Sequence, residues 1–105
     1  MKVTISSTGD NLESKIDQRF GRCAYFVIYD TESKAIEYIP NPNKDLEEGA
    51  GKAAVQLLST RNVQKIISGE FGIKIKPLLD SLKIQMIVIQ NQSLRIKDII
   101  EMLNY

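Results

Sequence analysis

Three short segments of the sequence place glycines beside cationic side chains, a combination that suits the binding of an anion. They span residues 19–23, 48–52 and 69–74. Glycine lets the backbone approach a ligand closely, and arginine or lysine supplies a full positive charge. We therefore predict a ligand-binding role, with no self-contained acid–base or nucleophilic reaction. The predicted site consists of Arg19, Gly21, Arg22, Cys23, Gly49, Gly51, Lys52, Gly69, Gly72 and Lys74.

Each glycine segment also has a purely structural interpretation. Gly49 and Gly51 open a predicted helix, whose N-terminal N–H groups and dipole favour an anion, but they could equally allow close helix packing. The segment is not a P-loop, because Ala53 follows Lys52 where that motif has serine or threonine. The 69–72 segment could be only a tight turn, and the arginines of segment 19–23 could be solvated or paired with Asp17.

Cys23 is the only cysteine and the single candidate for metal ligation by sulfur. Its arginine neighbour favours the thiolate, which is the form that binds metals. The alternative is a small buried residue at the entry to a strand. One cysteine forms no internal disulfide and no four-thiolate cluster site, so the fold does not depend on an oxidising compartment.

The composition excludes several classes of function. The 105 residues fit one domain, and they include no histidine, so every catalytic triad built on histidine is excluded. The net charge of +1 provides no electrostatic attraction to nucleic acid or to an anionic membrane. No signal peptide or membrane-spanning run is visible, and we expect a cytoplasmic location.

Hydrophobic periodicity predicts an α/β fold that positions these segments. Alternating or continuous apolar runs predict strands over residues 2–7, 25–29, 35–39, 63–68 and 84–90. Helical spacing predicts helices over residues 50–61, 75–82 and 94–103, with Pro77 in a first turn and Ser93 as an N-cap. The second and third strands should form an antiparallel hairpin, and the later strands should be parallel. The carboxyl ends of the parallel strands, where ligands usually bind, lead into residues 8–22, 69–74 and 90–93.

An ordered set of motifs resembles a known family. The motifs are Phe20-Gly21-Arg22, the aromatic strand from Tyr25 to Tyr29, Asn41-Pro42, Gly49-Ala50-Gly51, and Gly69 with Gly72 and Lys74. They resemble the dinitrogenase iron–molybdenum cofactor biosynthesis family, which includes NifX, NafY and the C-terminal part of NifB, over almost the whole chain. The resemblance implies a three-layer ribonuclease-H-like fold, with a five-stranded mixed sheet in the order 3-2-1-4-5, strand 2 antiparallel and helices on both faces.

The resemblance also implies a function. The chain would be a single, non-catalytic binding domain over residues 1–105, similar to carriers of iron–sulfur or iron–molybdenum clusters. Its partners would be cluster-assembly or redox proteins, with no nucleic acid and no membrane, and we expect a monomer or a weak dimer. The position before Phe20 is often histidine in this family and is Arg19 here, and Glu47 and Glu48 stand in the loop that often carries another histidine. A cluster would then be held mainly by charge and backbone donors, with at most the Cys23 thiolate.

Other functions remain as alternatives. The domain could bind no cofactor and serve as a protein-interaction scaffold, or it could bind another small anion such as a nucleotide or phosphate. Nuclease or phosphotransferase activity is disfavoured, because the first and fourth predicted strands contain no acidic residue.

Overall fold

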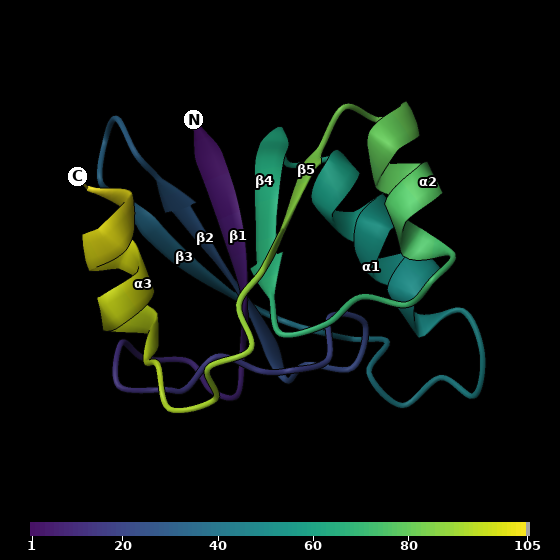
Figure 1. Ribbon diagram of the computed structural model, residues 1–105, viewed down its shortest axis with the longest axis horizontal. Helices are drawn as coiled ribbons and strands as arrows, with labels where there is room; N and C mark the ends of the chain where they lie inside the picture. The colour runs from purple at the N-terminus through teal and green to yellow at the C-terminus, as the bar shows by residue number, and fades with distance from the viewer. Residues whose placement is uncertain (105) are drawn as a thin grey trace.

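A five-stranded mixed sheet runs through the middle of the molecule, with helices on both faces (Figure 1). The computed structural model describes residues 1–104. The strands are β1 (Lys2–Ser7), β2 (Tyr25–Asp30), β3 (Ile36–Pro40), β4 (Val63–Ser68) and β5 (Gln85–Val88). The helices are α1 (Ala50–Ser59), α2 (Ile75–Ser81) and α3 (Ile96–Leu103).

The strand order β3-β2-β1-β4-β5 confirms the predicted topology. β2 lies antiparallel to both β1 and β3, whereas β1, β4 and β5 are mutually parallel. β1 therefore occupies the centre of the sheet, and its Val3 and Ile5 side chains are fully buried. The helix α1 precedes β4, α2 connects β4 to β5, and both cover one face of the sheet, whereas α3 follows β5 and covers the opposite face.

Two separate cores hold the three layers together. The first lies between the sheet and the helices α1 and α2, and includes Phe26 and Ile66 of the sheet with Leu58 and Leu79 of the helices. The second lies between the sheet and α3, which contributes Ile96, Ile99 and Ile100. In Figure 1, α3 accordingly lies on one side of the sheet, and α1 and α2 lie on the other. Among the described residues, no helix is long and apolar enough to cross a membrane.

The last strand and the last helix differ from the sequence prediction. β5 spans only Gln85–Val88 instead of residues 84–90, because its partner β4 ends at Ser68, which pairs with Val88. The prediction that Ser93 caps α3 is wrong: Arg95 is the N-cap, and its N–H donates to Asp98 Oδ2 at 2.9 Å. Ser93 instead closes a local turn by donating its hydroxyl to Asn91 Oδ1 at 2.6 Å. Pro77 lies in the first turn of α2, as predicted.

Candidate functional site

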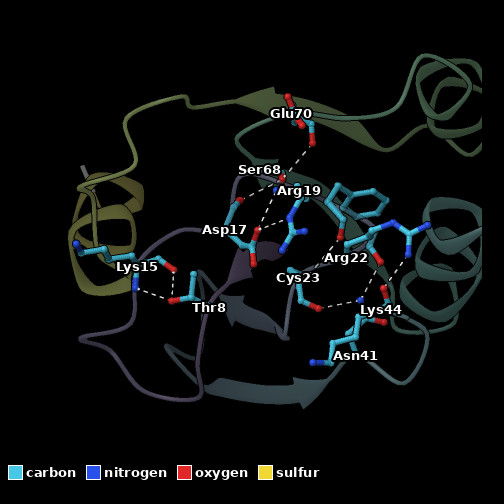
Figure 2. Close-up of polar contacts among 12 residues, drawn as sticks. Thr8, Lys15, Asp17, Arg19, Arg22, Cys23, Asn41, Lys44, Ser68 and Glu70 are labelled. Carbon is cyan, nitrogen blue, oxygen red and sulfur yellow. Dashed lines mark hydrogen bonds and ion pairs between the residues drawn. The ribbon is translucent and has the colours of Figure 1, made fainter. Parts of the chain in front are cut away.

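The connection from β1 to β2 crosses the carboxyl ends of the parallel strands and is tied to them by backbone hydrogen bonds. The Asp17 N–H donates to the Ser6 carbonyl of β1 at 2.8 Å. The Gly69 N–H donates to the Asp17 carbonyl at 3.4 Å, and the Phe20 N–H donates to the Glu70 carbonyl at 3.3 Å. These bonds place residues 17–20 directly beside the segment that follows β4 (Figure 2).

The same connection is also tied to the loop that precedes α3. The Ile16 N–H donates to the Leu94 carbonyl at 3.0 Å, and the Ile96 N–H donates to the Ser14 carbonyl at 2.8 Å. The chain between Ser14 and Phe20 is therefore held on two sides by segments far away in the sequence. Backbone hydrogen bonds of this kind fix the position of a loop more firmly than exposed side-chain contacts do.

An open groove of about 540 Å³ lies between the connection and the loop before α3. Its walls combine cationic, amide and hydroxyl side chains with one carboxylate. The lining residues are Thr8, Lys15, Ile16, Asp17, Gln18, Arg19, Gln92 and Ser93. The groove is large enough for a small polar ligand and lies where open α/β sheets usually bind ligands.

Three charged side chains line the groove, the cations Lys15 and Arg19 and the carboxylate Asp17. Asp17 Oδ1 accepts the Arg19 backbone N–H at 2.9 Å and lies 3.8 Å from Arg19 Nε. That ion pair is long, and the Arg19 side chain is 62% exposed, so most of its guanidinium donors face solvent. Lys15 is also exposed, whereas the neighbouring cations Arg95 and Lys97 both contact Glu13. The groove therefore presents a net positive charge to a ligand.

Gln18 adds an unsatisfied donor to this wall. Its Nε2 atom is buried and has no hydrogen-bond partner among residues 1–104. The residue lies against Gly69, where an added Cβ would come 2.6 Å from Gln18 Cα. Buried polar groups are nearly always paired, so this amide nitrogen is an exception; the surrounding protein encloses it, although other atoms of Gln18 line the groove.

The predicted glycines of segments 19–23 and 48–52 are brought together, but their backbones fill the space between them. A Cβ on Gly21 would lie 2.6 Å from the Gly51 nitrogen, and one on Gly51 would lie 2.8 Å from Ile75 Cδ1. Glycine is required at position 21 for close packing of this connection on α1, whereas a Cβ on Gly51 would meet only the end of the Ile75 side chain of α2. The structural alternative therefore accounts for Gly21 without any ligand.

Arg22 fastens a neighbouring loop and points away from the groove. Its guanidinium donates to the carbonyls of Lys44, at 2.9 Å, and Glu47, at 3.3 Å. Figure 2 shows Arg22 directed towards Lys44, on the far side of Cys23 from the pair formed by Asp17 and Arg19. Only one of the two predicted arginines, Arg19, thus lines the groove.

Cys23 is completely buried, and its thiol donates to the Phe20 carbonyl at 3.3 Å. Burial, together with the negative charge of Asp17, raises the pKa of Cys23 to about 12. The thiol is therefore protonated at neutral pH, which favours the structural alternative over the thiolate ligand. Among the residues that the structure describes, no three histidine, cysteine, aspartate or glutamate side chains form a metal-binding group.

The remaining predicted residues do not line the groove. Lys52 and Lys74 are exposed. Gly49 is the N-cap of α1 and adopts a left-handed conformation with φ of 77°. A Cβ on Gly72 would make only an ordinary 3.6 Å contact with Ile75 Cγ1, so neither conformation nor space demands glycine there. Gly69, in contrast, packs directly against Gln18 of the groove wall.

Sequence reasoning missed most of the groove lining, namely Thr8, Lys15, Gln18, Gln92 and Ser93. These residues have ordinary polar side chains and form no recognisable motif. A positional signal was nevertheless available, because residues 8–22 and 90–93 follow the carboxyl ends of β1 and β5.

The sheet order, the helices on both faces and the groove at the carboxyl ends define a small three-layer α/β domain with a ligand-sized groove. The chain belongs to the dinitrogenase iron–molybdenum cofactor family, whose family model matches residues 1–104. A comparison with curated proteins found no matching sequence.

Several solved structures are similar to this chain. The apo form of the orange protein from Desulfovibrio gigas is 28% identical with a TM-score of 0.88, and the match covers 95% of this chain and 83% of that one. A provisionally assigned NifB protein from Thermotoga is 29% identical with a TM-score of 0.79, covering 95% and 84%. A provisionally assigned dinitrogenase from Methanococcus jannaschii shares the fold at 23% identity, with a TM-score of 0.67 and coverage of 99% and 83%.

The contacts of Gly21 and Gly72 predict different effects of alanine substitution on stability. Gly21→Ala forces its Cβ against the backbone of Gly51, so the free energy of unfolding should fall by roughly 1–3 kcal/mol. Gly72→Ala meets no close contact and restricts the unfolded chain, so stability should be unchanged or rise by up to about 1 kcal/mol. Urea denaturation measures both. Equal effects of the two substitutions would contradict the packing role of Gly21.

The buried thiol predicts a pH-dependent stability. The folded pKa of about 12 lies above the ordinary value of 9.0, so its contribution is complete below pH 9 and is lost as the pH rises towards 12. The free energy of unfolding should therefore fall more steeply over this range in the wild type than in Cys23→Ala. Native Cys23 should also resist iodoacetamide at about pH 8 until the protein is unfolded. Rapid alkylation of the native protein would show that the thiol is accessible.

Proposed function

We propose that this domain binds a preformed, anionic metal–sulfur cluster as cargo in the groove between residues 8–19 and the loop 91–93, and releases it intact. The observation that carries the proposal is the groove itself, with Lys15 and Arg19 beside the orphaned amide of Gln18. A metal–sulfur cluster with net negative charge matches the cations, and its sulfur or oxygen atoms would accept a hydrogen bond from Gln18 Nε2 once that side chain turns into the groove.

The side chains of the groove suit a cluster that is bound by hydrogen bonds to its surface and not by bonds to its metal ions. The described residues include no group of three side chains able to ligate a metal, and the Cys23 thiol is buried and protonated. Lys15, Arg19 and Gln18 instead offer N–H groups, which bind the anionic surface of a cluster and leave its metals coordinated by their own sulfides. Binding of this kind is reversible, which suits a carrier better than a protein with a permanent cofactor.

The family and its structures support this proposal. The family model is named for the dinitrogenase iron–molybdenum cofactor, and the orange protein, at 28% identity, is described in an apo form, a term for a protein that also takes a ligand. A non-catalytic role is consistent with the residues of the groove. Asp17 is its only carboxylate, and it is engaged by the Arg19 N–H.

Charge removal in the groove tests the proposal. A cluster is assembled beforehand, without oxygen, from ferrous iron, sulfide and molybdate; the protein is then incubated with it, desalted, and examined for a retained chromophore and for bound metal. We expect a stoichiometric chromophore whose affinity falls about tenfold, or about 1.4 kcal/mol, in Lys15→Gln and again in Arg19→Gln. The matched controls Lys52→Gln and Lys74→Gln remove the same charge outside the groove and should change the affinity by less than about twofold.

Other outcomes of that experiment overturn the proposal. If Lys52→Gln or Lys74→Gln abolishes retention while the groove variants do not, the ligand lies beside the glycine segments. If no chromophore is retained but inorganic phosphate or ATP raises the melting temperature, the domain binds another anion. Absence of every ligand effect would support a scaffold role without cofactor.

Gln18 separates ligand binding from stability. Gln18→Met keeps the side-chain length and removes the buried unpaired amide, so the free energy of unfolding should stay constant or rise by about 1 kcal/mol. Chromophore retention should fall at the same time, because the amide is lost as a donor. Parallel thermal melting and retention measurements check this. A variant that is destabilised and still binds normally would show that Gln18 is only structural.

A further inference from the structure

The two edge strands of the sheet, β3 and β5, differ in features that discourage pairing with another chain. β3 forms one edge, where Glu37 pairs with Arg61 at 2.9 Å and Pro40 ends the strand. Charged residues and proline on an edge strand discourage pairing with another chain. β5 forms the other edge, and it carries neither a charge nor a proline.

The neutral character of the β5 edge extends beyond the strand. The chain from Ile84 to Leu94 contains no charged residue, no proline and no glycine. Val88 is 48% exposed, and Met86 and Ile87 are half-buried. In Figure 1 this edge is turned towards the viewer, with α3 to one side, α1 and α2 to the other, and no element drawn in front of it.

The backbone of β5 offers unpaired groups along this edge. The Ile89 N–H donates to the Ser68 carbonyl at 2.9 Å, so residues of the same parity as Ile89, including Ile87, face β4. Because hydrogen-bonding sides alternate along a strand, the N–H and C=O groups of Met86 and Val88 point outwards. Among residues 1–104, no backbone hydrogen bond beyond the sheet satisfies these outward groups.

We propose that β5 pairs with β5 of a second copy of this chain, antiparallel and about a two-fold axis at Ile87, to form a continuous sheet across a homodimer. In that register Met86 of each copy lies opposite Val88 of the other, so all the outward N–H and C=O groups are paired. Ile87 meets its own symmetry mate at the position between these hydrogen-bonded pairs.

Charge and symmetry together select a second copy as the occupant. A two-fold contact brings each segment against itself, so any charge near the axis would face a like charge. The segment 84–94 avoids this completely, whereas β3 could not. The apolar side chains of β5 contribute to both cores, Met86 beside α2 and Ile87 on the α3 side, so pairing extends both apolar layers across the axis. The interface is short, and the dimer is therefore expected to be weak and concentration-dependent.

Sedimentation analysis of the full chain from about 5 µM to about 500 µM tests the proposal, with mass increasing from monomer towards dimer. Val88→Lys places a charge one residue from the axis in each copy and should shift the midpoint at least tenfold higher in concentration. Val88 is half exposed, so the lysine can reach solvent in the monomer and the melting temperature of dilute protein should not change. Val88→Thr keeps the shape and neutrality of the side chain and should dimerise like the wild type.

Amide hydrogen exchange locates the contact. Exchange at Met86 and Val88 should slow as the protein concentration rises, whereas the Ile87 amide, already bonded to β4, should change little. A protein that stays monomeric at every concentration overturns the proposal. The β5 edge would then be free to pair with an extended segment of another protein. A dimer that survives Val88→Lys, with unchanged exchange at Met86 and Val88, overturns it as well.

Discussion

The position of the groove depends on the backbone hydrogen bonds that hold the β1–β2 connection across the carboxyl ends of the sheet. A connection of this length would be expensive to order by side chains alone, because each fixed residue costs about 1–2 kcal/mol of conformational entropy. Asp17 bonds to β1 and to the segment after β4, and Ile16 bonds to the loop before α3. These bonds turn three sequence-distant segments into one rigid wall, on which Lys15, Gln18 and Arg19 are displayed.

Close packing against α1 and the neighbouring loops also holds the β1–β2 connection in place. Gly21 lies against the backbone of Gly51 at the start of α1, and Arg22 and Asn41 bond to carbonyls of the adjoining loops. Phe20 packs on Phe26 and Phe71, with ring centroids 5.9 Å and 5.2 Å apart. The residues of the family motifs are thus largely those that build and fasten the end of the sheet, while less distinctive neighbours form the groove. A motif can be characteristic of a family because it specifies a scaffold.

The protonation of Cys23 follows from that scaffold. The cationic neighbours that favour a thiolate in the sequence are turned away: Arg22 faces the 44–47 loop, and Arg19 reaches outwards over Asp17. The thiol is left with desolvation and the charge of Asp17, both of which raise its pKa. Arg19 and Arg22 are close to Cys23 in the sequence, but in the folded chain their guanidinium groups contact other residues. The cationic side chains that remain exposed around the groove are those of Lys15 and Arg19.

The sequence by itself determined the element types, the sheet order through its family resemblance, and the end of the sheet at which the groove lies. Apolar periodicity is local, so it identified every strand and helix, with errors confined to their ends, such as β5 and the cap of α3. Only the tertiary structure decided whether Gly21 and Gly51 face a ligand or each other, whether Cys23 is ionised, and that Gln18 and Lys15 share a groove with Gln92. The physical reason is that burial, charge screening and close approach depend on contacts between segments far apart in the chain, and no local pattern records them.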